Sequence, residues 1–394
     1  MLETLKPAPP DRIVEVLNLF RADPRTEKLD LGIGIYKDAA GRTPVMRAVK
    51  AAEARLLAEQ DSKAYVGILG DPAFVGAIAD LALGDAVPRD RLSGGQTPGG
   101  TGAIRLLFEL VRRASPGATV WMSDPTWPNH PAILGQLGIP GRSYRYFDPE
   151  GGGVDFAGMM RDLAGMKRGD VLLLHGCCHN PTGAGLSLEE WRELSRFVVA
   201  EGVVPLVDLA YQGFGDGLAE DVAGVRHMAT AVPEMLLATS CSKNFGVYRD
   251  RVGAAFVLSE TPAAAAVTTS NVGSLGRLNY SFPPDHGAKV VAMILADPEL
   301  RADWTAELEA MRRGMLEIRQ GLADALRRET NSDRYDFVAA HRGMFSRLGL
   351  SPEQVAALRD RHGIYMVGDS RVNIAALPTE KLEALAKAMV AVGA

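Results

Sequence analysis

The feature that most constrains the fold is an alternation of short apolar segments and helical segments between about residues 90 and 260. The apolar segments end near Met122, Leu174, Val207 and Thr239, and patterns of helical period separate them. Strands that alternate with helices are typical of a mostly parallel sheet that is covered by helices. We therefore expect an α/β fold whose ligands bind beyond the carboxyl ends of the strands.

Segment 240–251, with the sequence SCSKNFGVYRDR, follows the last of these apolar segments and carries Lys243. Apolar and small neighbours favour a neutral amine at this lysine, and a neutral amine can form a Schiff base with a carbonyl. The polar neighbours that suit a phosphate group are Ser240, Ser242 and Arg251. The segment therefore indicates pyridoxal phosphate, although an ordinary loop lysine is the alternative from this segment alone.

Asp208 directly follows the apolar segment 203–207, which predicts a buried strand. A carboxylate at the end of a buried strand is costly unless it is paired. A protonated pyridine nitrogen would be a suitable partner, because the ion pair keeps the ring positive and able to accept electrons. A helix cap or a structural salt bridge is the alternative. Tyr211, three residues further on, could donate to a ring oxygen or simply pack in the core.

Two further features suit anions. The segment 99–102, GGTG, opens a predicted helix, whose free N–H groups and dipole favour negative charge. It fits neither a Walker A loop nor the GxGxxG pattern, so it is also compatible with an ordinary turn. Arg371 lies in a strand-like segment, and its planar guanidinium suits a carboxylate if it faces inward.

His175 and His179 have a spacing that binds metals on a helix, but Gly176 and Pro181 argue against a helix here. No third ligand is evident, so we predict no metal site. The remaining interpretations are a histidine that supports Asp208 and an ordinary core histidine.

The composition excludes several classes of protein. The net charge is −5 and no basic tract occurs, which gives no support for a nucleic-acid partner. No apolar run approaches the ~18 to 20 residues that span a bilayer, and the first residues have no signal-peptide core. Three cysteines, two of them adjacent, do not make a disulfide framework. We therefore expect a cytoplasmic protein.

The two chain ends are predicted to form a small α+β domain together. Residues 1–44 are assigned to an N-terminal arm and part of this small domain, residues 45–310 to a large cofactor-binding domain, and residues 311–394 to the rest of the small domain. Residues 29–36 predict a strand interrupted by glycines. The tail reads as strand, helix, strand and helix over residues 336–348, 352–361, 364–367 with 371–375, and 379–392.

Nine segments occur in a characteristic order along the whole chain: LGIGIYKD, TPGGTGA, SDPTWPNH, HGCCHNPTG, DLAYQGF, SCSKNFGVYRDRVG, NYSFPPDHGA, GMFSRLG and RVNIAAL. Together they resemble the class I, fold-type I pyridoxal-phosphate aminotransferases, in the branch of aspartate and aromatic amino-acid aminotransferases. The resemblance implies a mostly parallel seven-stranded sheet in the large domain. It also implies a homodimer whose active sites are shared between subunits.

The resemblance assigns roles to individual residues. Lys243 forms the Schiff base with the cofactor and moves protons, and Asp208 pairs with the pyridine nitrogen. His130 and His175 support Asp208. The other implied cofactor contacts are Tyr65 from the neighbouring subunit, Gly100, Thr101, Trp127, Asn180, Tyr211, Ser240, Ser242 and Arg251.

The resemblance also implies the substrate contacts. Arg371 binds the α-carboxylate, with the Gly34 backbone nearby, and Arg277 reaches from the partner subunit toward a side-chain carboxylate. Ile35 and Phe345 supply an apolar wall. Trp127 and Asn180, already named for the cofactor, also face the substrate.

Two departures from the strict aspartate enzymes bear on specificity. Phe282 stands where those enzymes carry an asparagine near Arg277, and Gly99 replaces a serine found in some relatives. An arginine without that polar partner would swing out to admit an aromatic ring. We therefore predict an aromatic amino-acid aminotransferase that also accepts aspartate, with 2-oxoglutarate as amino acceptor. Lys37 and Thr43, more typical of aspartate enzymes, keep a strict dicarboxylate enzyme as the alternative.

Two other functions remain to be tested. A dehydrogenase or nucleotide-binding protein would use the glycine loop, but the GxGxxG pattern and its acidic ribose partner are missing. A β-lyase or a regulatory binder would keep the cofactor and change the reaction.

Overall fold

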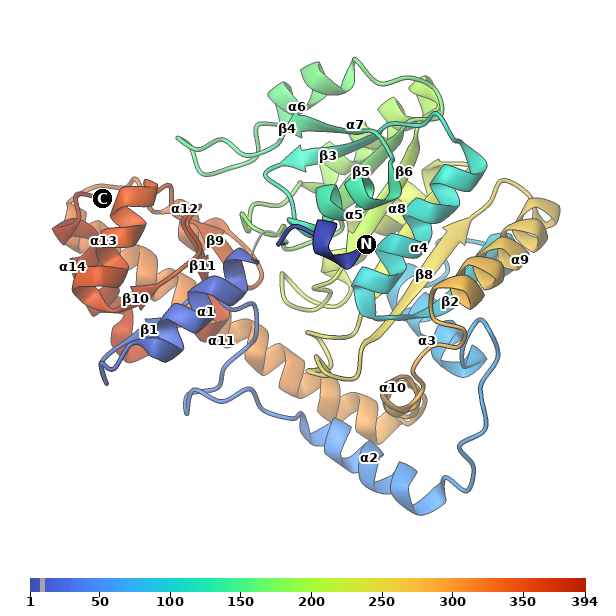
Figure 1. The fold of residues 1–394 in the computed structure, drawn as a ribbon, viewed down its shortest axis with the longest axis horizontal. Coiled ribbons are helices and arrows are strands. Elements are labelled where there is room, and N and C mark those ends of the chain that lie inside the picture. Colours follow the sequence, from blue (N-terminus) through green and yellow to red (C-terminus); the bar gives the residue numbers. More distant parts are fainter. Residues whose placement is uncertain (8–10) are drawn as a thin grey trace.

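A seven-stranded sheet forms the centre of the molecule in the computed structural model, which describes residues 1–7 and 11–394 (Figure 1). Residues 8–10 of the predicted arm lie outside the described residues. The strands, in spatial order, are β2 (Leu92–Pro98), β8 (Val252–Leu258), β7 (Met235–Ser240), β6 (Val204–Leu209), β5 (Val171–His175), β3 (Val120–Asp124) and β4 (Gly141–Arg145). Only β8 runs antiparallel to its neighbours, so the predicted mostly parallel sheet is confirmed.

The sheet is buried on both faces, which explains why its strands are continuous apolar runs. In β5, Val171 and Leu173 pack into one core, and Leu172 and Leu174 pack into the other. This alternation follows from the two-residue period of a strand. The first core contains side chains of α4 (Gly99–Ala114), α5 (Asn129–Leu137) and α9 (Pro262–Asn279). The second contains side chains of α2 (Arg47–Glu59), α3 (Pro72–Leu83), α6 (Phe156–Leu163), α7 (Leu188–Glu201), α8 (Ala223–Ala231), α10 (His286–Ala296) and α11 (Pro298–Thr330).

A third core joins the two ends of the chain. Leu31 packs among side chains from Leu322 to Met389. Two small sheets support this core: β1 (Leu29–Asp30) pairs in parallel with β10 (Ile364–Tyr365), and β9 (Phe345–Arg347) pairs antiparallel with β11 (Arg371–Asn373). The helices of this part are α1 (Arg12–Ala22), α12 (Phe337–Ala340), α13 (Pro352–His362) and α14 (Leu382–Ala391).

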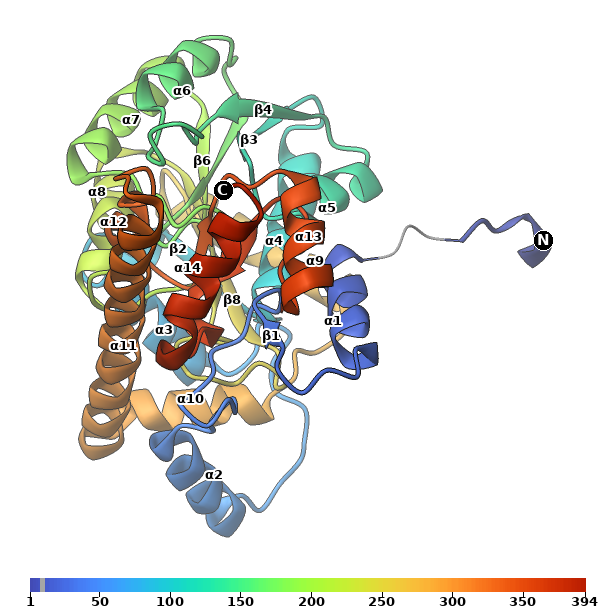
Figure 2. The same ribbon diagram turned by 90° about the vertical axis from the view of Figure 1, so that its left-hand side faces the viewer.

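The long helix α11 connects the second core to this third core (Figure 2). Its side chains from Trp304 to Met315 belong to the second core, and those from Leu322 to Leu326 belong to the third core. The helix runs through residue 311 without a break, so the domain boundary drawn there stays a prediction.

Two predicted strands are only partly correct. Residues 336–348 contain the short helix α12 before β9, because the buried Arg319 donates to the carbonyl oxygens of Val338, Gly343 and Phe345 and holds this segment in a compact turn. Residues 29–36 form a strand only at Leu29–Asp30. No helix among the described residues combines the length and apolar character needed to cross a membrane.

Candidate active site

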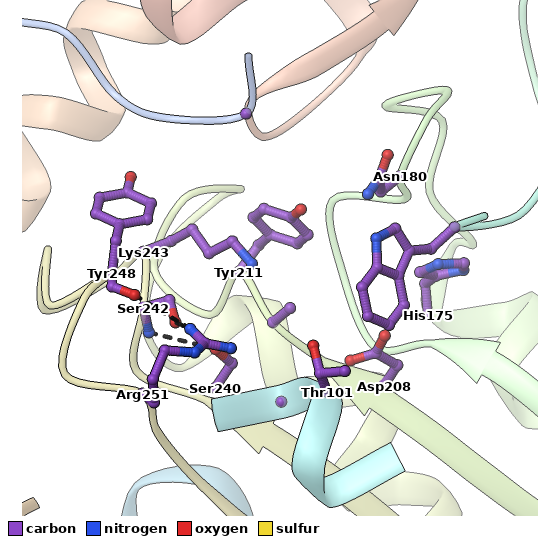
Figure 3. Close-up of a pocket in the computed structure, with 14 residues that line it drawn as sticks. Thr101, His175, Asn180, Asp208, Tyr211, Ser240, Ser242, Lys243, Tyr248 and Arg251 are labelled. Atoms are coloured by element: carbon purple, nitrogen blue, oxygen red, sulfur yellow. Dashed lines mark hydrogen bonds between the residues drawn. The ribbon is translucent and has the colours of Figure 1, made fainter. Parts of the chain in front are cut away.

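A cavity of about 190 Å³ lies beyond the carboxyl ends of β5, β6 and β7 (Figure 3). Its position is the one expected for an α/β sheet. The lining residues are Gly34, Gly100, Thr101, Trp127, His175, Asn180, Asp208, Ala210, Tyr211, Ser240, Ser242, Lys243, Tyr248 and Arg251. Residues that are far apart in sequence therefore meet here, and most of them are predicted site residues.

Lys243 follows β7 and points across the cavity toward Tyr211 (Figure 3). Its Nζ lies 4.8 Å from the centre of the Tyr211 ring. Burial lowers the pKa of Lys243 to about 8, although the negative charge of Asp208 opposes this effect. A substantial fraction of this amine is therefore neutral and nucleophilic near pH 8.

Asp208 is the penultimate residue of β6 and lines the same cavity. Its Oδ2 accepts a hydrogen bond from Nε2 of His130 at 3.1 Å, and Nδ1 of His130 lies 2.8 Å from the Thr126 hydroxyl. Burial opposes ionisation of Asp208, but the bond from His130 and nearby positive charge outweigh it and hold the pKa of Asp208 below its usual value. The site therefore maintains a buried carboxylate that suits a protonated ring nitrogen.

His175 lies beside Asp208, because β5 and β6 pair these two residues in register. Its buried Nε2 has no hydrogen-bond partner within the described chain, and burial lowers the pKa of His175 to about 3. His179 bonds instead to the hydroxyls of Ser123 and Thr182. The absence of a metal here stays a prediction, since ligand atoms of His130, His175 and Asp208 lie within 4.8 Å of one another.

The residues that are predicted to bind the phosphate converge at the start of α4. Nη1 of Arg251 lies 3.4 Å from the Ser242 hydroxyl, and Thr101 lies in the first turn of the helix. Gly99 has a φ of +70°, and a Cβ there would lie 2.6 Å from Nη2 of Arg251. A Cβ on Gly253 would lie 2.6 Å from the backbone of Gly99. Both glycines therefore permit the close approach that forms this cradle.

Arg371 lies on β11 and is not among the residues that line the cavity. It is buried, its Nη2 donates to the Gly32 carbonyl at 2.7 Å, and its guanidinium lies 4.6 Å from the centre of the Phe345 ring. Burial lowers the pKa of Arg371, and its Nε has no partner within the described chain. Such a guanidinium has free donors for a carboxylate.

The donor set fits pyridoxal phosphate. Buried polar atoms of His175, Asn180 and Arg371 lack partners within the described chain, and buried polar groups ordinarily have one. The helix start and Arg251 suit the phosphate, Asp208 suits the ring nitrogen, and Lys243 suits the aldehyde.

Several predicted residues lie outside the cavity. Tyr65 is 84% exposed and stacks on Phe282, with ring centres 4.7 Å apart. Arg277 lies with its guanidinium 5.2 Å from the centre of the Phe282 ring and hydrogen-bonds to Ser281. His130, Ile35, Phe345 and Arg371 are likewise not among the residues that line the cavity.

Tyr248 and Ala210 line the cavity but were not predicted as site residues. The hydroxyl of Tyr248 accepts a hydrogen bond from the backbone N–H of Tyr36 at 3.1 Å. An aromatic residue five positions after the lysine, in the same loop, was the only available signal, and ordinary core packing explains such a residue equally well.

Residues 26–389 match the family of class I and II aminotransferases. The chain is 54% identical to an aromatic-amino-acid aminotransferase of Paracoccus denitrificans and 42% identical to an aspartate aminotransferase of Escherichia coli K12, with all of each chain covered. A solved structure of an aromatic amino acid aminotransferase with 3-indolebutyric acid matches at 54% identity with a TM-score of 0.98, again covering both chains fully.

A second solved structure, an aromatic-amino-acid aminotransferase of Burkholderia pseudomallei covalently bound to pyridoxal phosphate, is 39% identical. It has a TM-score of 0.96 and covers 100% of this chain and 99% of that chain. These matches extend over the sheet, the cavity and both chain ends. The chain therefore belongs to the class I and II aminotransferase family.

Proposed function

We propose that this enzyme transfers the amino group of tyrosine or phenylalanine, and also of aspartate, to 2-oxoglutarate, with pyridoxal phosphate as cofactor. The observation that carries the proposal is that one cavity contains both Lys243, an amine with a lowered pKa, and Asp208, a carboxylate with a lowered pKa. Bound pyridoxal phosphate supplies an aldehyde that links to amines and a ring that takes up electrons from the substrate α-carbon.

The residues of this chain provide the remaining steps. Arg371 binds the substrate α-carboxylate and orients the α-carbon. The neutral amine of Lys243 would accept the substrate α-proton. Asp208, held by His130, keeps a proton on the ring nitrogen. Asn180 and Tyr211 would donate to the phenolic oxygen of the cofactor, and Trp127, which lines the same cavity, would contact its ring.

The N-terminus of α4 and the lysine loop, residues 240–251, would hold the phosphate. Gly100 and Thr101 supply backbone and hydroxyl donors at the positive end of the helix dipole. The hydroxyl groups of Ser240 and Ser242 and the guanidinium of Arg251 complete the cradle. These groups would hold the cofactor in place by its phosphate.

The active enzyme is proposed to be a homodimer in the cytoplasm. Tyr65 and Arg277 lie at the surface, where they are available to a partner's cavity. Gln96 joins the segment after Tyr65 to the segment after α9, which carries Arg277, since its side chain accepts from the Asp71 N–H and donates to the Pro284 carbonyl. Exposed apolar side chains such as Leu278 (75% exposed) support a subunit interface in this region.

The stacking of Arg277 on Phe282 supports the aromatic preference. A cation over an aromatic face is stabilised outside the substrate pocket, so an aromatic donor meets no obligatory charge. Aspartate and 2-oxoglutarate would draw the same arginine toward their side-chain carboxylate. The alternative, a strict dicarboxylate enzyme, is supported by the aspartate aminotransferases among the relatives.

The test is a panel of amino donors with 2-oxoglutarate, measured on the reconstituted protein and on Lys243→Ala. We expect turnover of tyrosine, phenylalanine and aspartate by the wild type, and a loss of at least about 10⁴-fold in the variant. Borohydride should trap the cofactor on Lys243. Ammonia release without pyridoxamine phosphate would instead indicate a lyase, and the exposed Lys387→Ala variant serves as the control.

A further inference from the structure

Residues 31–36, called the strap below, run from the third core to the lysine loop, residues 240–251. Gly34, at its centre, lines the cavity. The strap is not part of a regular sheet, because β1 ends at Asp30. Its backbone groups must therefore find partners elsewhere, since unpaired buried groups are costly.

Asn373 supplies most of these partners on one side. It is fully buried on β11, two residues after Arg371. Its Nδ2 donates to the carbonyl oxygens of Ile33 at 2.5 Å and Ile35 at 2.8 Å, which flank Gly34. In the described part of the chain no other hydrogen-bond donor reaches these two carbonyls.

The orientation of the Asn373 amide is fixed by its other atoms. Its Oδ1 accepts from the Ala375 N–H at 3.0 Å, and its backbone N–H donates to the Leu31 carbonyl at 2.9 Å. Only one orientation of the amide places the acceptor on Ala375 and both donors on the strap. The side chain therefore acts as a rigid connection.

The strap has a second anchor, which comes from the large domain. The Tyr36 N–H donates to the hydroxyl of Tyr248, which lies in the lysine loop. Arg371 adds a bond to the Gly32 carbonyl from the strand that also carries Asn373. The strap therefore joins the carboxylate-binding strand to the lysine loop.

We propose that Asn373 is a positioning residue that sets the distance between the Gly34 backbone and the Arg371 guanidinium. In this way it determines substrate affinity. This inference rests on the proposed function, in which Arg371 binds the substrate carboxylate. Asn373 does not line the cavity. It acts through the strap, and none of its hydrogen bonds involves Lys243 or Asp208.

The test compares Asn373→Ala and the isosteric Asn373→Asp with wild type, all as holoenzymes. Each variant removes the hydrogen-bond donors of the Ile33 and Ile35 carbonyls, so the Gly34 backbone between them loses its fixed position. We expect KM for the amino donor to rise about tenfold or more while kcat changes less than about threefold. The affinity for unreactive 3-phenylpropionate or succinate, measured by calorimetry, should fall by the same factor as KM rises.

The matched control is Asp170→Asn, another buried polar group. Asp170 accepts from the Thr119 N–H, the Lys167 N–H and Nε1 of Trp121, and it precedes β5 at the end of the sheet opposite the cavity. This variant should lower the melting temperature and leave KM and probe affinity unchanged.

Two results would overturn the role of Asn373: variants whose KM and probe affinity stay within twofold of wild type, or variants that lose only kcat and thermal stability. If Asn373→Ala does not fold, Asn373→Asp, which keeps the side-chain shape, decides the question. A wild type that binds the probes but transfers no amino group would refute the proposed function, while the probe affinities would still decide the role of Asn373.

Discussion

His130 donates from Nε2 to Asp208 at 3.1 Å while its other ring nitrogen contacts the Thr126 hydroxyl, so the histidine fixes the carboxylate from behind the cavity. The His130 ring is itself fully buried and packs edge-on against Trp127. The arrangement holds one carboxylate oxygen and leaves Asp208 facing the cavity. A buried charge is tolerated here because it has a hydrogen-bonded partner.

Replacing Asp208 with asparagine should lower kcat by about 10³-fold or more, equivalent to ~4 kcal/mol of transition-state stabilisation. The amide keeps the shape but cannot hold a proton on the ring nitrogen. Stopped-flow measurement of the first half-reaction checks this, with Asp170→Asn as the control for a buried acid outside the cavity. An Asp208→Asn variant with near-normal kcat would remove the proposed role of the carboxylate.

The lowered pKa of Lys243 predicts the pH dependence of cofactor capture. Because the pKa is about 8, the protonated and unreactive amine dominates below pH 8 and the neutral amine above it. The rate at which cofactor-free protein binds pyridoxal should therefore rise about tenfold per pH unit up to pH 8 and then level off. Absorbance stopped-flow between pH 6 and 10 measures this rate. A rate that keeps rising to pH 10 would show an ordinary lysine.

Gly99→Ala should weaken cofactor binding by about tenfold or more. The new Cβ would collide with the Arg251 guanidinium, and the positive φ of Gly99 adds strain for any other residue. Equilibrium dialysis with pyridoxal phosphate gives the dissociation constant. Gly117→Ala is the control, because a Cβ there meets no atom within 4 Å. Equal dissociation constants for both variants would contradict the proposed cradle.

Arg277→Leu should lower kcat/KM for aspartate by about 100-fold or more and for phenylalanine by less than about threefold. The reason is that only aspartate has a side-chain carboxylate for this arginine, and loss of a charged partner is costly. Steady-state kinetics with both donors checks the ratio, with the exposed Arg361→Leu as control. Equal losses for both donors would argue against a role of Arg277 in selection.

The sequence determined the chemistry-bearing ends of the strands. Lys243 and Asp208 were predictable because each follows an apolar run, and both local signals, burial and strand end, lie within a few residues. The same reasoning predicted the helix start at Gly99. It failed at residues 336–348, where the buried Arg319 imposes a turn that no local pattern reveals.

Only the tertiary structure decided how distant segments meet. The cavity contains both Gly34 and Lys243, more than two hundred positions apart, because the strand order and the third core bring them together. The lowered pKa of Lys243, the bond between Tyr248 and Tyr36 and the stacking of Tyr65 on Phe282 all depend on contacts between segments that are distant in sequence. Local periodicity encodes which residues are buried, whereas long-range packing decides which buried residues face one another.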